Sequence, residues 1–305
     1  MVISVYITCY NKGAFIAQAI ESILDQTLQP GEIIIVDDGS NDNSREKIKG
    51  FVSRYPTIIK PIFNEKNYGI TKTRNIAISR CTGDLITFLD GDDYFYKEKL
   101  ASESERLLNT DAAVIYSNFN YINEKGEITG KFSEENDMPA EGDIFINTFC
   151  RNYNVSSGNN YIYEMYYKNC ANEIGCYDEE IILWEDWDFR IRMSKIFNYG
   201  YCTQINSAYR KLKDGLHNSD EKFHFREQIK IYNNNKPITA DLIDKEKIII
   251  SNRVYAKIKY LFLEIIRKSI QDKKIFQAII HSLYFILTFK TRKSISTVYK
   301  ALTKS

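Results

Sequence analysis

The sequence predicts an α/β fold in which a doubly wound, mostly parallel sheet is flanked by helices. Short β-branched or aromatic runs alternate with segments whose apolar residues recur at helical spacing. Polar and acidic motifs follow these apolar runs directly, which is where an open α/β sheet binds its ligands. With 305 residues, of which 44% are hydrophobic, the chain is long enough to bury a sizeable core.

The amino-terminal residues give the clearest order of elements. Residues 2–7 are β-branched and aromatic, as in a strand, and residues 15–24 carry apolar side chains at helical spacing. Residues 32–36 form a second short apolar run. Cap-type residues at 41–44 precede a helix face made by residues 48–55. The order of strand, helix, strand and helix is typical of a parallel sheet.

The alternation continues into the middle of the chain. Residues 58–63 and 85–89 are predicted strands, separated by a helix over residues 71–80. Another strand is expected at 113–119. Residues 127–160 are polar and poorly periodic, and they predict no clear element.

The carboxyl-terminal residues differ from the rest in charge and pattern. Residues 245–305 hold 14 Lys and Arg against 3 Asp and Glu, although the whole chain has a formal net charge of +1. Apolar and basic helices are expected at about 246–270, 275–289 and 294–303. The second is shorter than the roughly 20 residues that a bilayer span needs. Two roles stay open for this tail: binding to an anionic membrane surface, or packing on the body or on a second subunit in a homodimer.

Composition excludes several classes of protein. The six cysteines are scattered without a C-x-x-C pair, so neither a zinc site nor a disulfide framework is expected. The amino terminus has no basic segment and only a short apolar run, so we expect no signal peptide and a cytoplasmic location. If the tail binds lipid, the protein would be peripheral at the inner face of the cell membrane. The basic residues accompany apolar helix faces, so nucleic acid is not an expected partner.

Three carboxylates, those of Asp90, Asp92 and Asp93, follow the apolar run 85–89. Carboxylates this close repel one another unless a cation or hydrogen-bond donors compensate. Hard oxygen ligands of this kind suit Mg²⁺ or Mn²⁺ that carries a phosphorylated substrate. Taken alone, the same residues are explained equally well as an acidic turn after a strand.

Further polar motifs follow or adjoin the other predicted strands. They are Thr8-Cys9-Tyr10-Asn11, Val36-Asp37-Asp38-Gly39-Ser40, and Asn67-Tyr68-Gly69 ahead of Lys72-Thr73-Arg74-Asn75. In this order and spacing, together with the acidic motif, they resemble the nucleotide-sugar-binding half of the family 2 glycosyltransferases of bacterial surface-polysaccharide type. The resemblance covers residues 2–100 closely and continues more loosely to about residue 220. It implies a GT-A fold.

The resemblance implies a nucleoside diphosphate site at these motifs. Tyr10 would stack on the base and Thr8 would touch the base or the ribose. Asp38 would accept a hydrogen bond from a uracil or thymine N3–H, which fits a UDP- or dTDP-sugar. Arg74 would direct its planar, positively charged guanidinium group to phosphate or sugar, although it can also be a solvated helix residue. Asn67 would either contact the donor or only make the turn into the helix predicted at residues 71–80.

The same resemblance assigns Mn²⁺ or Mg²⁺ to the acidic motif. Asp92 is the first choice as metal ligand, Asp90 would hold the ribose or a metal-bound water, and Asp93 would help either. The cation would neutralise charge on the departing nucleoside diphosphate. His217 lies in a stretch that resembles the family's Y-R…H…S segment and could reach the metal or the diphosphate. A loop histidine is more often an ordinary surface residue.

Residues 174–190 look like the acceptor side of the same family, with its E-D motif at the start of a helix. Asp186 matches the family's general base. Trp184, Glu185 and Trp187 are the expected acceptor-binding residues. Carboxylates in a first helical turn are also common for capping and dipole reasons, and both tryptophans can be core residues.

The resemblance therefore implies a metal-dependent inverting glycosyltransferase. It would move a hexose or N-acetylhexosamine from a UDP- or dTDP-sugar to a glycan or lipid-linked glycan acceptor. Residues 1–100 would form the nucleotide-sugar half, residues 101–235 the acceptor half, and residues 236–305 the basic helical tail. One alternative is a polyprenyl-phosphate glycosyltransferase, which would commonly carry membrane spans. Another is a nucleotide-binding or scaffold protein of the same fold, which would lack the base or a metal ligand.

Overall fold

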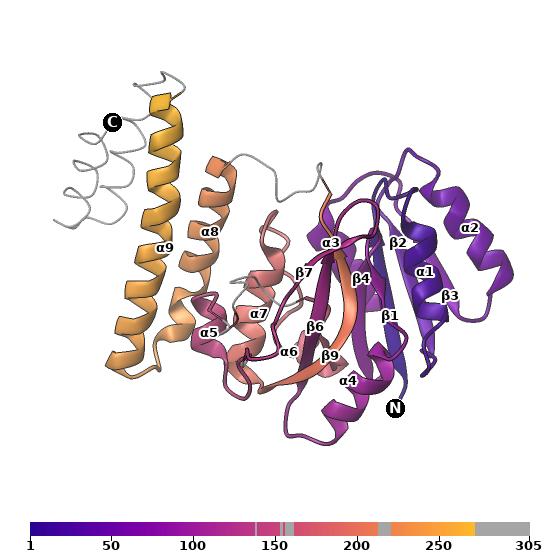
Figure 1. Ribbon diagram of the computed structural model, residues 1–305, viewed down its shortest axis with the longest axis horizontal. Coiled ribbons are helices and arrows are strands. Elements are labelled where there is room, and N and C mark those ends of the chain that lie inside the picture. Colours follow the sequence, from indigo (N-terminus) through magenta and orange to yellow (C-terminus); the bar gives the residue numbers. More distant parts are fainter. Residues whose placement is uncertain (138, 153–154, 156–161, 213–220, 272–305) are drawn as a thin grey trace. The chain divides into compact units, whose positions relative to one another are not determined.

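The computed structural model of the protein describes residues 1–305 except 138, 153–154, 156–161, 213–220 and 272–305 (Figure 1). The chain divides into two compact units, residues 1–215 and 216–305. Among the described residues, the first unit holds the strands of the sheet and the second is helical.

Four parallel strands form the amino-terminal half of the sheet. They lie in the order β3-β2-β1-β4, and each crossover between consecutive strands is a helix. The strands are β1 (Ile3–Cys9), β2 (Glu32–Asp37), β3 (Ile59–Phe63) and β4 (Leu85–Asp90), and the helices are α1 (Ile16–Leu24), α2 (Ser44–Arg54) and α3 (Ile70–Arg80). The alternation that the sequence predicts is confirmed here.

The carboxyl-terminal half of the sheet is mixed. β8 lies antiparallel between β4 and β6, β6 runs parallel to β9, and the short strands β5 and β7 run antiparallel to β9 and β6. The long ladders are the parallel ones, so the sheet is mostly parallel, as predicted. The bounds are β5 (Tyr94–Phe95), α4 (Lys99–Leu108), β6 (Val114–Ile122), β7 (Ile128–Lys131), α5 (Phe145–Phe149), β8 (Met165–Tyr167), α6 (Lys168–Glu173), α7 (Glu185–Ile196) and β9 (Tyr199–Arg210).

The segment 127–160, for which the sequence predicts no clear element, contains β7 and α5. Three of the four residues of β7 are exposed, so the strand shows no alternation of apolar and polar side chains. α5 has five residues, which is too short to display a helical period.

The register of β1 brings the predicted motifs to one edge of the sheet. Thr8 is paired with Asp90 of β4, and Cys9 with Asp37 of β2. The residues that follow these three strands therefore meet at their carboxyl ends. Gly39, just after β2, has a φ of +76°, and a Cβ added there would lie 2.5 Å from the carbonyl carbon of Lys66. Glycine thus allows the loop after β3 to lie against the end of β2.

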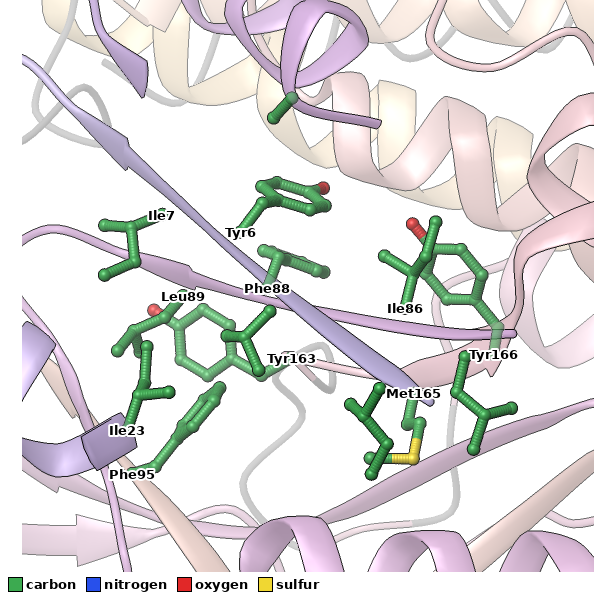
Figure 2. Packing of buried hydrophobic residues seen from close by; sticks show 14 of the residues in the cluster. Tyr6, Ile7, Ile23, Ile86, Phe88, Leu89, Phe95, Tyr163, Met165 and Tyr166 are labelled. Carbon is green, nitrogen blue, oxygen red and sulfur yellow. The ribbon is translucent and has the colours of Figure 1, made fainter. Parts of the chain in front are cut away.

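The central strands are buried on both faces (Figure 2). All seven residues of β1 are buried. Tyr6 of β1 stacks on Phe88 of β4 with ring centroids 5.4 Å apart, and Tyr163 packs edge-on against Phe88 at 5.4 Å. A parallel strand covered on both faces carries this continuous apolar pattern. The strand ends that carry the site are therefore fixed by the core.

The second unit is helical where it is described. It comprises α8 (Glu221–Asn235), the 3₁₀ turn η2 (Lys236–Thr239) and α9 (Asp244–Gln271). α9 confirms the helix predicted at about 246–270. None of the helices in the described part of the chain is both long and apolar enough to cross a membrane. The helices predicted at 275–289 and 294–303 fall outside the described residues.

Candidate functional site

The three carboxylates at and just beyond the end of β4 contact different partners. Asp90 accepts a hydrogen bond from Thr8 Oγ1 at 2.9 Å and pairs with Arg74 Nη2 at 3.2 Å. Asp92 Oδ2 lies 2.6 Å from Lys12 Nζ. Burial raises the pKa of Asp92 against the opposing charge of Lys12, and the charge of Asp90 adds to the rise. The acidic motif thus forms separate ion pairs and hydrogen bonds rather than one compact cluster.

Asp93 is the most deeply buried of the three. Its two oxygens accept hydrogen bonds from the Tyr163 hydroxyl and from the Arg210 backbone N–H. Burial, together with the charges of Asp92 and Asp90, raises the pKa of Asp93 well above its ordinary value. Asp93 is 2% exposed. A carboxylate buried in this way is better placed to support the site from within the protein than to contact a donor directly.

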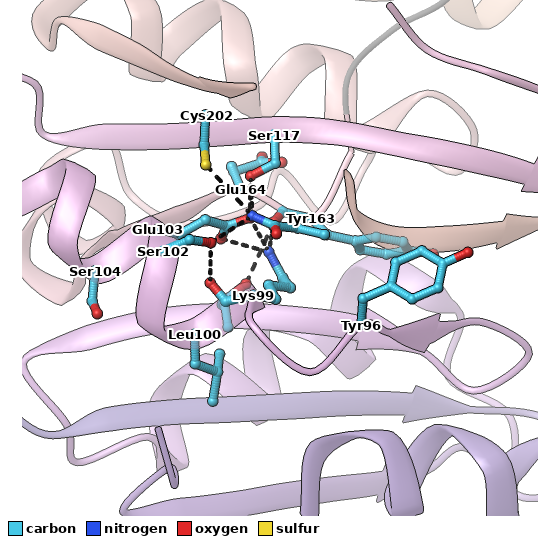
Figure 3. A network of polar contacts seen from close by, with 12 residues as sticks. Tyr96, Lys99, Leu100, Ser102, Glu103, Ser104, Ser117, Tyr163, Glu164 and Cys202 are labelled. Atoms are coloured by element: carbon cyan, nitrogen blue, oxygen red, sulfur yellow. Dashed lines mark hydrogen bonds and ion pairs between the residues drawn. The ribbon is translucent and has the colours of Figure 1, made fainter. Parts of the chain in front are cut away.

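Tyr163 is held through its hydroxyl and also through its backbone, and Figure 3 shows the network around the backbone contact. Its carbonyl oxygen accepts a hydrogen bond from Lys99 Nζ at 2.7 Å. Its φ of +54° lies in the left-handed region, which a non-glycine residue rarely adopts. Lys99 forms a fully buried ion pair with Glu103, to which the Ser117 hydroxyl also donates. This network fixes Tyr163 and, through it, the carboxylate of Asp93.

Replacing Lys99 with Met should destabilise the protein by about 3–5 kcal/mol, because Glu103 would stay buried without its counter-charge. The double variant K99M/E103M, in which neither charge remains, should recover most of that loss. Urea denaturation followed by circular dichroism gives both free energies of unfolding. A double variant no more stable than K99M would contradict this account of the pair.

A divalent cation would meet Asp92 and Asp90 at this edge. Lys12 already places a positive charge 2.6 Å from Asp92, so this carboxylate is arranged to face a cation. In the described part of the chain, no three His, Cys, Asp or Glu side chains converge as a metal site. Two carboxylates hold Mg²⁺ or Mn²⁺ only when diphosphate oxygens and water complete the coordination, which is the usual mode for Mg²⁺. His217 lies outside the described residues.

Asp38 organises the loop that follows β3. Its Oδ1 accepts hydrogen bonds from Asn64 Nδ2 and from the Tyr68 N–H, each at 2.8 Å, and its Oδ2 accepts one from the Gly69 N–H at 2.9 Å. Asn67 Oδ1 accepts from the same Gly69 N–H at 2.9 Å. Asn67 therefore makes the turn into α3, whatever else it contacts.

Thr8 and Tyr10, at and just beyond the end of β1, differ in exposure. Thr8 is 6% exposed with its hydroxyl bonded to Asp90, whereas Tyr10 is 42% exposed. The Asp38 N–H donates to the carbonyl of Cys9 at 2.8 Å, so Tyr10 and Asp38 flank the same edge of the sheet. An exposed ring can stack on the face of a base, and a neighbouring buried carboxylate can accept a hydrogen bond from the edge of that base.

Arg74 of α3 links the two halves of the site. It is 5% exposed, which excludes a solvated helix residue. Its Nη2 pairs with Asp90, and its Nη1 lies 3.5 Å from Glu185 Oε1. The guanidinium also lies over the rings of Phe88 and Tyr177, 4.8 and 5.4 Å from their centroids. One cation thus joins the acidic motif of β4 to the start of α7.

Two adjacent carboxylates open α7. Asp186 Oδ2 pairs with Arg190 Nη1 at 2.7 Å, and its Oδ1 accepts from the Trp187 N–H at 2.8 Å. Burial raises the pKa of Asp186, but the charges of Arg190 and Arg74 are among those that outweigh it, and the net pKa is lowered. Burial raises the pKa of Glu185 to about 7 against the opposing charge of Arg74. At neutral pH, Asp186 is therefore ionised, while Glu185 carries a proton part of the time.

The two tryptophans beside these carboxylates have different surroundings. Trp187 is 4% exposed, and its indole N–H donates to the carbonyl of Thr148 in α5 at 2.8 Å, so it anchors α7 in the core. Trp184 is half-buried and has a left-handed φ of +66°. The guanidinium carbon of Arg151 lies 4.1 Å from the centroid of its ring. Of the pair, Trp184 is the one with surface left for an acceptor.

Comparison with known proteins identifies the family. Residues 4–211 match the sequence model described as Glycosyl transferase family 2. The chain belongs to this family. One curated relative is the UDP-Glc:alpha-D-GlcNAc-diphosphoundecaprenol beta-1,3-glucosyltransferase WfgD of Escherichia coli. It is 34% identical over 130 residues, which cover 43% of this chain and 50% of WfgD. The chain spans half or less of the length of most of the curated relatives that it matches.

Solved structures share the fold of this family member. TarS residues 1–349 of S. aureus, in complex with UDP-GlcNAc, superpose with a TM-score of 0.59 at 16% identity, covering 95% of this chain and 93% of that chain. GalNAc-T7 with UDP, GalNAc and Mn²⁺ gives a TM-score of 0.60 at 14% identity, covering 83% and 54%. The GT-A fold that the sequence predicts is therefore confirmed.

The sequence did not single out several residues that surround the site: Lys12, Tyr163, Glu164, Arg190 and the side chain of Arg210. The Arg210 Nε donates to the Asp92 carbonyl at 2.8 Å, although 118 positions separate the two residues. Lys12 directly follows the motif of residues 8–11, and its charge, opposite to that of Asp92, was the available signal. Tyr163 and Glu164 lie directly before the three-residue strand β8, which is too short to show a periodicity that could mark them.

Proposed function

We propose that this family 2 member is a metal-dependent inverting glycosyltransferase. It moves a hexose or N-acetylhexosamine from a UDP- or dTDP-sugar to a glycan or lipid-linked glycan acceptor. Arg74 carries the proposal, because it pairs with Asp90 and lies 3.5 Å from Glu185, the neighbour of Asp186. The donor motif and the acceptor motif therefore meet at one cation, as a transfer between two substrates requires.

In this proposal, residues 1–100 hold the donor. Tyr10 stacks on the base, and Asp38 accepts a hydrogen bond from the imide N–H of uracil or thymine. Thr8 and Asp90, already bonded to each other, hold the ribose.

The acceptor half, residues 101–235, presents Asp186 to the attacking hydroxyl. Asp186 takes the hydroxyl proton as the oxygen forms its bond to the anomeric carbon. The bond from that carbon to the diphosphate oxygen breaks on the opposite face, so the configuration inverts. Arg74 holds positive charge beside the departing diphosphate. When bound, Mn²⁺ or Mg²⁺ supplies Lewis-acid neutralisation of the leaving group, and Asp92 and Asp90 would hold it.

The proposed acceptor class draws support from the relative WfgD. Its name gives UDP-Glc as donor and a GlcNAc-diphosphoundecaprenol acceptor, which agrees with a role in surface-polysaccharide synthesis for this chain. The basic residues of 245–305 would then contact the anionic surface that carries such a lipid, or a second subunit.

A panel of nucleotide sugars with Mn²⁺ tests the proposal by thermal stabilisation and by slow donor hydrolysis. UDP- or dTDP-sugars should stabilise the protein by about 2.7 kcal/mol when present at roughly 100 times their Kd. CDP- and ADP-sugars, whose bases lack an imide N–H, serve as matched controls and should stabilise much less. Equal stabilisation by UDP- and CDP-sugars would contradict the role of Asp38. No stabilisation by any of them would contradict the function.

A further inference from the structure

Two buried charged side chains, those of Arg190 and Glu164, continue a line of ion pairs from Asp186 into the protein. Arg190 follows Asp186 by four residues on α7, so the two side chains share one face of the helix. The Arg190 Nη1 donates to Asp186 Oδ2 at 2.7 Å. On its other side, Arg190 contacts Glu164, which lies directly before β8 and next to Tyr163 in the chain.

The contact between Arg190 and Glu164 is bidentate. Arg190 Nε donates to Glu164 Oε1 at 3.0 Å, and Nη2 donates to Oε2 at 2.9 Å. Both residues are 1% exposed. A planar guanidinium matches two carboxylate oxygens and still presents a third nitrogen to Asp186, which a lysine cannot do. The orientation of Arg190 is therefore set before any substrate arrives.

The carboxylate of Asp186 is held from two sides yet stays accessible. Oδ1 accepts the backbone N–H of Trp187 at 2.8 Å, and Oδ2 accepts Arg190. The side chain of Asp186 nevertheless remains 26% exposed. The side chain of Glu185, the preceding residue, lies 3.5 Å from Arg74 and is 10% exposed. Only Asp186 of these two carboxylates thus combines a rigid partner with exposed surface.

We propose that Arg190, braced by Glu164, is a positioning residue of the transfer reaction that holds Asp186 ionised and in one orientation. This inference rests on the proposed role of Asp186 as the base. Arg190 itself touches no substrate, because it is buried behind the carboxylate. Its contribution is made through Asp186.

Several charged or titratable side chains face Asp186. They are those of Glu185 and Arg190 on its own helix, of Arg74 on α3, of Arg151 after α5, and of Tyr209 on β9. Among the cations, Arg190 has the largest effect in lowering the pKa of Asp186. Removing Arg190 should therefore raise that pKa, so that Asp186 takes up a proton at a higher pH. The acidic limb of the rate profile should then move to higher pH.

Replacing Arg190 with Met should lower kcat on the order of 100-fold, with little change in the KM for the donor. The acidic limb of the kcat profile should move to higher pH in the same variant. R192M is the matched control, because Arg192 lies on the same helix and forms a similar i,i+4 ion pair with Asp188 at 2.8 Å. It removes a charge from α7 without touching Asp186, so the limb should stay in place.

The variant R190M leaves Glu164 buried without its partner and can lose stability for that reason. The double variant E164Q/R190M removes this penalty and should melt closer to the wild type than R190M does. Its acidic limb should still lie above that of the wild type. Recovery of both kcat and the position of the limb in the double variant would show a purely structural role and overturn the inference.

Carbon-13 NMR of aspartate carboxylates titrates Asp186 without reference to activity, with D186N giving the assignment. The Asp186 titration should move to higher pH in R190M and stay in place in R192M. An unmoved titration in R190M would overturn the inference. A titration that moves while the rate profile does not would overturn Asp186 as the base, and with it the inferred role of Arg190 in transfer, but would leave the ion pair standing.

Discussion

Replacing Asp186 with Asn should lower the rate of sugar transfer by about 10²–10⁴-fold and leave nucleotide binding intact. Asn keeps the shape and one oxygen to accept the Trp187 N–H, but it cannot take the proton from the acceptor hydroxyl. Single-turnover transfer gives the rate, and calorimetric titration with UDP gives the affinity. A variant that binds nucleotide and transfers sugar at the wild-type rate would contradict the role of Asp186 as the base.

Two further variants separate this effect from the general loss of a carboxylate. D188N removes a carboxylate two residues along α7, whose side chain is 3% exposed and pairs with Arg192. It should reduce stability while keeping kcat within a small factor of the wild type. E185Q addresses the competing base, because the pKa of Glu185 is raised to about 7 by burial. If E185Q abolished transfer while D186N retained it, the base would be Glu185.

The pH profile adds a second criterion. The pKa of Asp186 is lowered, so its ionised form is present at neutral pH and is lost only as the pH falls through that lowered value. Transfer that depends on Asp186 should therefore persist well into the acidic range. Transfer that depends on Glu185 should instead fall near pH 7.

The sequence was sufficient to predict the fold and the site wherever the local pattern and the tertiary structure agree. β1, β2 and β4 are short apolar runs, and each is followed by the polar residues that make the site. Because parallel strands share one carboxyl edge, pairing Thr8 with Asp90 follows almost directly from the strand order. α1, between β1 and β2, buries apolar residues at regular helical spacing.

Other contacts of the site could not be predicted, since they join residues that are distant in sequence. Lys12 meets Asp92 across 80 positions, and Glu164 meets Arg190 across 26. Neither pairing leaves a period or a spacing in the sequence. The same holds for the network around Tyr163, where the requirement is only that each buried polar group finds a partner.

Replacing Asp92 with Ala should abolish the dependence of nucleotide binding on Mn²⁺ or Mg²⁺. Asp92 is the proposed first ligand, and changes even in the outer shell of a metal site cost about 10–100-fold in metal affinity. Lys12, 2.6 Å from Asp92 in the protein, would then keep its charge at the site. UDP affinity in D92A should accordingly be the same with Mn²⁺ as with EDTA, whereas in the wild type Mn²⁺ should tighten it.

The matched control for D92A is D84A. Asp84 precedes β4 at the opposite end of the strand, where its carboxylate accepts the Val2 N–H at 2.8 Å. D84A should retain the full metal dependence, because its carboxylate lies at the other edge of the sheet. If D92A kept the same Mn²⁺-dependent gain in UDP affinity as D84A, Asp92 would not be a metal ligand. The pair of Lys12 and Asp92 would then be a permanent ion pair at the phosphate edge, with the positive charge supplied by the protein itself.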